Sequence, residues 1–191
     1  MLKSHYRGRG GNVLRFARNA PDRGKDALSE RPFERYINVS ACDADLKYIL
    51  RKIMSKWDYG GHISLYFNKT FHTIWQGLEH RVYMYIYEHP DWDIWIGGHS
   101  LGGALATLAT FFLVHSKLVQ PDAVKLMTFG QPRVGDKAFA DAFDNEVGYA
   151  YRVVHSRDIV PSIPRSGYWH QGAEGTLYYN CEERKSRLGR I

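Results

Sequence analysis

The stretch Asp93-Ile94-Trp95-Ile96-Gly97-Gly98-His99-Ser100-Leu101-Gly102-Gly103-Ala104-Leu105 decides how this sequence is interpreted. Its first residues predict a short buried strand, and an apolar stripe with several alanines predicts a helix from Leu101 onward. Between them, Gly98-x-Ser100-x-Gly102 has the spacing of a nucleophile elbow. A serine hydroxyl is a weak nucleophile unless a sharp turn presents it to a base, and flanking glycines remove side chains that would clash there. Ser100 is therefore the candidate nucleophile.

The rest of the chain alternates between helical and extended patterns. Strands that alternate with helices favour a mostly parallel sheet with helices on both faces. We predict helices over 43–57, 65–87, 101–113 and 137–143, and strands over 93–97, 124–129, 149–155 and 175–179.

Composition indicates a globular protein, with 44% apolar residues and a net charge of +6. The charge is concentrated at the ends, so we divide the chain into a basic arm or lid-like segment (1–40), a main domain (41–181) and a basic tail (182–191). No nucleic-acid-binding motif accompanies the basic arm, and we expect no nucleic-acid partner. Cys42 and Cys181 allow one disulfide, which sequence alone does not decide.

Four blocks resemble the fungal-type (class 3) lipase family, and nematode members in particular. They are residues 96–106 (IGGHSLGGALA), 128–135 (TFGQPRVG), 151–161 (YRVVHSRDIVP) and 167–171 (GYWHQ), in the family's order. The resemblance covers about residues 60–180. It implies an α/β-hydrolase fold of a mostly parallel sheet flanked by helices. We interpret the chain as N-terminally truncated, because it has no room for the strands that normally precede the family's oxyanion motif.

The order of a hydrolase triad on this fold is Ser, then Asp or Glu, then His. Asp158 follows a predicted strand end, where a loop can project its carboxylate toward the elbow, and the resemblance also falls on it. Asp136 is instead predicted as a helix N-cap. His170 is the only histidine after Asp158, and the resemblance places it in the family's histidine segment. We predict Ser100, Asp158 and His170 as the catalytic residues.

Two N–H groups should stabilise the oxyanion of an acyl-transfer intermediate. One belongs to Leu101, the residue after the nucleophile. For the other, Tyr6-Arg7-Gly8-Arg9 is the only match to the family's oxyanion motif, with Arg9 where the family has Thr or Ser. Losing one such donor typically lowers kcat by about 10²–10³-fold.

The resemblance implies a carboxylic ester hydrolase similar to triacylglycerol lipases. Its substrate would be an acylglycerol or another lipid ester, with transient contact to a lipid surface. The alternative is a truncated, catalytically impaired domain that acts as a binding module or is an incomplete gene product. We expect no cofactor and no metal, since no clustered Cys/His spacing occurs, and we expect a monomer. The resemblance implies an extracellular location; a cytoplasmic one is the alternative because no secretory signal is read in the first residues.

Overall fold

The computed structural model describes residues 11–18, 35–40 and 53–177. Six strands form one sheet in the order β2-β1-β5-β6-β7-β8. The parallel part consists of β5 (Trp92–His99), β6 (Val124–Phe129), β7 (Ala150–His155) and β8 (Ala173–Leu177). The strands predicted from sequence are confirmed here, with small shifts at their ends.

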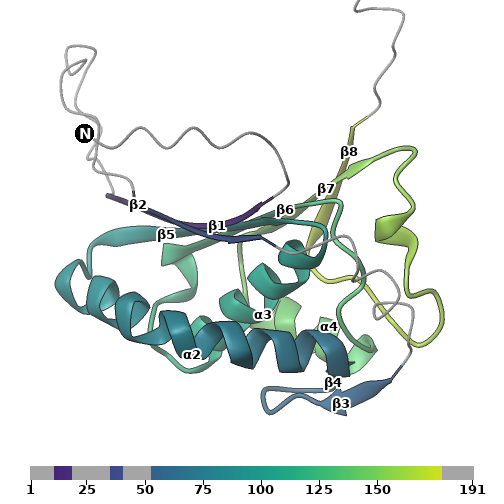
Figure 1. Cartoon of the computed structure of the whole chain (residues 1–191), viewed down its shortest axis with the longest axis horizontal. Coiled ribbons are helices and arrows are strands. Elements are labelled where there is room, and N and C mark those ends of the chain that lie inside the picture. Colours follow the sequence, from purple (N-terminus) through teal and green to yellow (C-terminus); the bar gives the residue numbers. More distant parts are fainter. Residues whose placement is uncertain (1–10, 19–34, 41–52, 178–191) are drawn as a thin grey trace, which may run out of the picture.

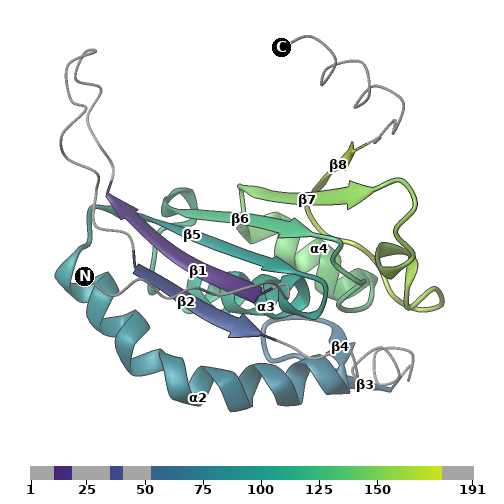
Figure 2. The same ribbon diagram turned by 45° about the horizontal axis from the view of Figure 1, so that its top comes forward.

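The three described α-helices all lie on one face of this sheet (Figures 1 and 2). They are α2 (Leu65–Glu88), α3 (Leu101–His115) and α4 (Lys137–Glu146). The expectation of helices on both faces is therefore wrong for the described helices. From β5 to β8 the strand order follows the chain order, and right-handed crossovers then return each connecting helix to the same face.

Two strands extend the sheet beyond β5 on the side opposite to β6. β1 (Gly11–Arg18) pairs antiparallel with β5, with Leu14 opposite Ile96, and β2 (Arg35–Ser40) pairs antiparallel with β1. The prediction of a lid-like arm is wrong for these two segments, which are strands of the sheet. The predicted truncation concerns strands before the motif at residues 6–9, which precedes both β1 and β2 and lies outside the described residues. Charged residues interrupt the apolar pattern of both segments, so strand formation here reflects pairing with an open sheet edge more than local propensity.

The helix predicted over 43–57 is also wrong where the structure describes it. Met54–Lys56 is strand β3, which forms a small antiparallel pair with β4 (His62–Ser64). Trp57 follows β3 and is buried against the ring of Phe71 from α2. Of the apolar residues whose spacing suggested a helix, Met54 and Trp57 thus belong to a hairpin and the residue after its first strand, next to α2. Cys42 and Cys181 lie outside the described residues, as do most of the predicted arm and tail.

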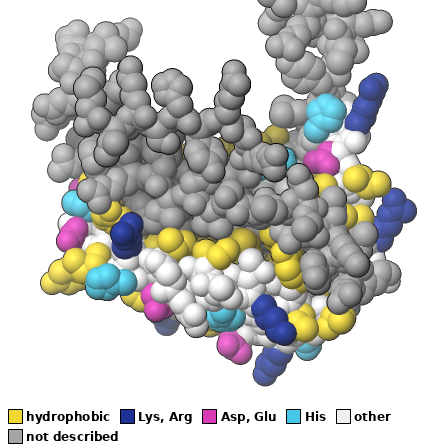
Figure 3. Space-filling model, viewed as in Figure 1, with side chains coloured by type: hydrophobic (Ala, Val, Ile, Leu, Met, Phe, Trp, Pro, Cys, Tyr) yellow, Lys and Arg dark blue, Asp and Glu magenta, His cyan; other side chains and the backbone are white. Residues whose placement is uncertain are grey.

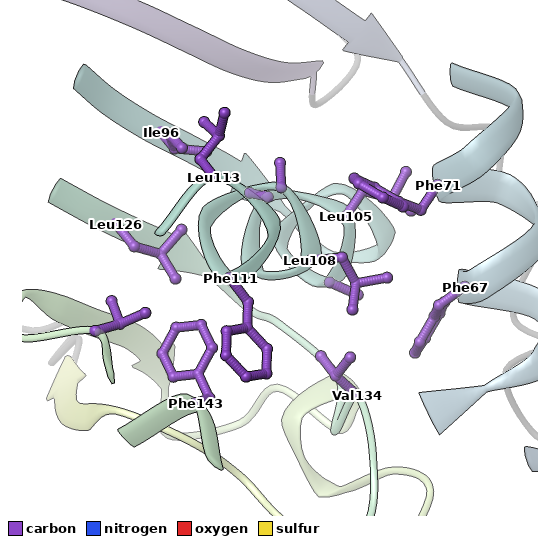
Figure 4. Packing of buried hydrophobic residues seen from close by; sticks show 14 of the residues in the cluster. Phe67, Phe71, Ile96, Leu105, Leu108, Phe111, Leu113, Leu126, Val134 and Phe143 are labelled. Atoms are coloured by element: carbon purple, nitrogen blue, oxygen red, sulfur yellow. The ribbon is translucent and has the colours of Figure 1, made fainter. Parts of the chain in front are cut away.

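Helix α3 is the centre of the core (Figure 4). Nearly all its residues are buried, because it lies between the sheet and the two other helices. Leu108 and Phe111 are completely buried, with Phe67 of α2 on one side and Phe143 of α4 on the other. Truncating a side chain like Leu108 to alanine typically costs about 2–5 kcal/mol. The helix that carries the elbow is therefore rigidly held. No helix in the described part of the chain is long and apolar enough to cross a membrane.

Candidate active site

Ser100 forms the turn between β5 and α3 in a strained backbone conformation, with φ 54° and ψ −126°. Such a conformation typically costs a non-glycine residue about 1–3 kcal/mol and persists only where the surroundings enforce it. The backbone N–H of Ser100 donates to the carbonyl of Phe129 at the end of β6 (2.9 Å). A Cβ on Gly98 would lie 2.2 Å from the carbonyl oxygen of Gly102, so no side chain fits there. The local geometry is the nucleophile elbow that the motif predicts.

The amino end of α3 faces the same turn. Leu101 is the first residue of the helix, so its N–H has no acceptor one turn earlier within the helix. The positive end of the helix dipole lies at this point, and no acidic residue occupies the first turn. These features suit a backbone donor to an oxyanion. Arg9, the other predicted donor, lies outside the described residues.

Asp158 lies just beyond β7, at the same edge of the sheet as Ser100. Its Oδ1 accepts a hydrogen bond from the N–H of Val160 (2.9 Å), which fixes the carboxylate. Its Oδ2 points over Gly130, where a Cβ would lie 2.6 Å from that oxygen and 3.6 Å from Nε2 of His99. Gly130 has φ 56° and follows β6. Asp158 and the residue preceding Ser100 therefore converge on the space that this glycine leaves open.

His170 is held elsewhere. Its Nε2–H donates to the carbonyl of Pro161 (2.8 Å), and its buried Nδ1 has no hydrogen-bond partner among the described residues. Burial, followed by the positive charge of Arg152, lowers the pKa of His170 to about 4. The ring makes no hydrogen bond to Ser100 or Asp158. The structure thus brings Ser100 and Asp158 to one edge of the sheet, and no hydrogen bond joins His170 to either.

A buried polar cluster that was not predicted from the sequence lies against helix α3, which follows the elbow. The hydroxyl of Thr107 on α3 lies 3.0 Å from the carbonyl of Gly103 and 3.1 Å from Oε1 of Gln131, and it accepts from Nε2 of Gln171 (3.2 Å). The backbone carbonyl of Gln171 accepts from Nε of Arg152 (2.7 Å). We call Thr107, Gln131 and Gln171 the Thr107 cluster. It connects the elbow helix to the loop after β6 and to the histidine segment.

Two further details concern the surroundings of the site. Asp136 caps α4 as predicted, its Oδ1 accepting from the N–H of Phe139 (2.8 Å). Burial raises the pKa of this carboxyl, but the N–H groups of Phe139 and His62 and the His62 ring outweigh it and lower the pKa overall. Within the described residues, no group of three or more His, Cys, Asp or Glu side chains could hold a metal ion.

A serine at a strained strand-to-helix turn on a largely parallel sheet defines an α/β-hydrolase. The family model described as "Lipase (class 3)" matches residues 37–167, and the chain belongs to this family. Lipase ZK262.3 of Caenorhabditis elegans is 42% identical over 107 residues, which are 56% of this chain and 30% of the relative. The secreted mono- and diacylglycerol lipase 1 of Fusarium solani is 39% identical over 88 residues, 45% of this chain and 25% of the relative.

The fold is also similar to that of a solved lipase structure. A lipase from Rhizopus microsporus var. chinensis superposes with a TM-score of 0.67 and 27% identity, over 76% of this chain and 52% of the other. The chain therefore spans about half or less of the length of the relatives it matches.

Proposed function

We propose that this chain is a carboxylic ester hydrolase that acts on acylglycerols, with Ser100 as its nucleophile. One observation carries the proposal: Ser100 has φ 54° at the end of the central strand, and Gly98 is the residue that permits it. Backbone strain of this kind is retained where it presents a reactive group. The names of the relatives, lipase and mono- and diacylglycerol lipase, support the substrate class.

The reaction would follow two-step acyl transfer. A base takes the proton of Ser100 while its Oγ bonds to the ester carbonyl carbon, and the N–H of Leu101 donates to the oxygen that becomes negative. The alcohol then leaves with that proton, and water releases the acid from the serine. Asp158 would orient the base and stabilise its charged form. A base must lie within about 3 Å of the serine oxygen during the reaction.

His170 as this base stays a prediction, and the geometry does not support it. To reach Ser100 the ring would have to give up its bond to Pro161 and leave the buried position that lowers its pKa. The geometry favours a supporting role, in which His170 holds the loop that carries Asp158.

A second candidate function follows from the hydroxyl of Ser100 itself. No histidine among the described residues hydrogen-bonds to it. A chain that folds around this elbow without a base would bind lipid esters but turn them over slowly, which is the impaired binding module that the sequence left open.

A fluorophosphonate probe and a short-chain chromogenic ester distinguish the two functions. We expect the purified chain to be labelled at Ser100 and to hydrolyse the ester, and Ser100→Ala to abolish both, with a rate loss of about 10⁴-fold or more. Ser116→Ala, at the other end of α3, is the matched control. A folded chain with no labelling would support the binding module, and hydrolysis that persists in Ser100→Ala would overturn the assignment.

The remaining properties of the protein are part of the same proposal. Transient contact with a lipid surface is supported by exposed apolar side chains near the site, Ile159 next to Asp158 and Phe129 at the end of β6. Secretion is supported by the name of the Fusarium relative. We propose a monomer that needs no cofactor and binds no nucleic acid. Light scattering and the recovery of tagged protein from the culture medium test the oligomeric state and the location.

A further inference from the structure

A second polar recess lies behind the loop that carries Asp158. It is a cavity of about 440 Å³ lined by Arg133, Arg152, Arg165, Trp169, His170 and Glu174, together with the backbone next to them. In Figure 3, Lys and Arg side chains lie along the right-hand side of the molecule, where Figure 1 shows β8 and the loop after β7. Neither Ser100 nor Asp158 lines the cavity. Of the three predicted catalytic residues, only His170 lines it.

The cavity carries an excess of positive charge. Arg152 is only 6% exposed and pairs with Glu174 (Nη1 to Oε2, 3.0 Å). The Nη1 group of Arg133 donates hydrogen bonds to the backbone carbonyls of Pro164 and Arg165. These bonds orient the guanidinium group but do not neutralise its charge. Among the described residues, neither Arg133 nor Arg165 forms an ion pair. The cavity is thus lined by three guanidinium groups and one carboxylate.

One carboxylate outside the lining, that of Asp144, also acts on Arg152. His170 lines the cavity in its neutral form at pH 7, because burial and the charges of Arg152 and Arg133 lower its pKa to about 4. Its neutral Nδ1 is buried and has no hydrogen-bond partner in the part of the chain that the structure describes. Arg152 is buried and Arg133 is half-buried, whereas Arg165 is exposed. The first two charges are partly removed from water and attract an anion more strongly than charges at an open surface, because the effective dielectric constant is lower there.

We propose that this cavity binds a phosphate group. Guanidinium groups are planar forks that match the geometry of phosphate oxygens, and bonds between two charged partners are stronger than neutral ones. Trp169 lies at the rim with 54% of its surface exposed, and Nζ of Lys137 is 6.0 Å from its ring centre. An exposed indole beside basic groups suits the boundary between lipid headgroups and water. The phosphate can belong to a lipid headgroup or be free in solution.

Calorimetric titration with inorganic phosphate tests the site at low ionic strength, on the full chain carrying Ser100→Ala so that turnover cannot interfere. We expect Arg165→Gln and Arg133→Gln each to weaken binding by about tenfold, the effect of losing one charge-assisted hydrogen bond. Arg81→Gln, an exposed arginine on α2, is the matched control and should bind as the parent does. The side chain of Arg165 makes no hydrogen bond among the described residues, so its variant should fold even if Arg133→Gln does not.

Vesicle flotation identifies the source of the phosphate. Vesicles of phosphatidylcholine with phosphatidic acid are compared with phosphatidylcholine alone. Binding to the anionic vesicles that Arg165→Gln weakens and Arg81→Gln does not would assign the headgroup, while an effect on inorganic phosphate alone would assign free phosphate. Equal phosphate affinity in the parent, Arg165→Gln and Arg81→Gln, or no affinity in any, would overturn the proposal. Labelling of Ser100 in the parent chain reports on the proposed function separately.

Discussion

The Ser100 turn and the Thr107 cluster are both polar regions next to helix α3, and they are built in opposite ways. At the turn the backbone is strained, while the serine hydroxyl has no hydrogen-bond partner among the described residues. In the cluster, Thr107 lies on a regular helix, and buried side chains bond to one another. His170, next to Gln171 in the sequence, resembles the second region in that its ring donates a hydrogen bond, to the carbonyl of Pro161. The difference separates groups held ready for chemistry from groups that hold the fold together.

The largest expected effect comes from removing the space that the strained turn needs. Gly98→Ala places a Cβ 2.2 Å from the backbone of Gly102, which no side-chain rotation relieves. We expect labelling of Ser100 to be lost and the free energy of unfolding to fall by about 3 kcal/mol or more. Thermal unfolding and probe labelling measure both. Gly148→Ala meets nothing within 4 Å and should change stability by no more than about 0.5 kcal/mol. If the two variants behave alike, the elbow is not constrained as described.

The second largest effect is expected from Asp158→Asn, which should lower the rate of hydrolysis and leave the melting temperature unchanged. In Asp158→Asn the amide oxygen can still accept from the N–H of Val160, but the negative charge is lost. We expect the rate of ester hydrolysis to fall by about 10⁴-fold, as for the loss of charge in other triads. Melting temperature and hydrolysis are measured together, with the exposed Asp122→Asn as control. A full rate in Asp158→Asn would remove this residue from the site.

These two regions also differ in how far the sequence revealed them. The strand over 124–129, the cap at Asp136 and the elbow at Ser100 were predictable because each depends on a few adjacent residues. The pairing of β1 with β5 was not, since a distant sheet edge supplies its hydrogen bonds. The order of the triad residues along the chain singled out His170, the only histidine after Asp158. This order does not determine where the ring lies, and the ring bonds to the carbonyl of Pro161. The contact between Thr107 and Gln131 was not predictable, because the two residues are 24 positions apart and no local pattern relates them.

The pH dependence of stability tests whether His170 has a structural role and is not the catalytic base. Its pKa is about 4 in the folded chain and about 6.5 when unfolded, so between these values the unfolded chain binds the extra proton. Stability present above pH 6.5 is therefore lost as the pH falls toward 4, by up to about 3 kcal/mol. Urea unfolding should show a smaller loss for His170→Gln than for the parent chain. The variant should also keep more ester hydrolysis than Asp158→Asn. Hydrolysis lost as completely as in Ser100→Ala would restore His170 as the base.

The smallest effect should come from one hydroxyl within the Thr107 cluster. Thr107→Val keeps the shape of the side chain but leaves Oε1 of Gln131 and Nε2 of Gln171 without this partner in a completely buried place. We expect a loss of about 1–3 kcal/mol and a melting temperature lower by about 4–10 °C. Thr110→Val is the matched control, since Thr110 is equally buried on the same helix and its hydroxyl has no hydrogen-bond partner among the described residues. That variant should be neutral or stabilising. If both valines cost the same, the hydrogen bonds of the cluster contribute nothing, and packing alone holds the elbow helix against the histidine segment.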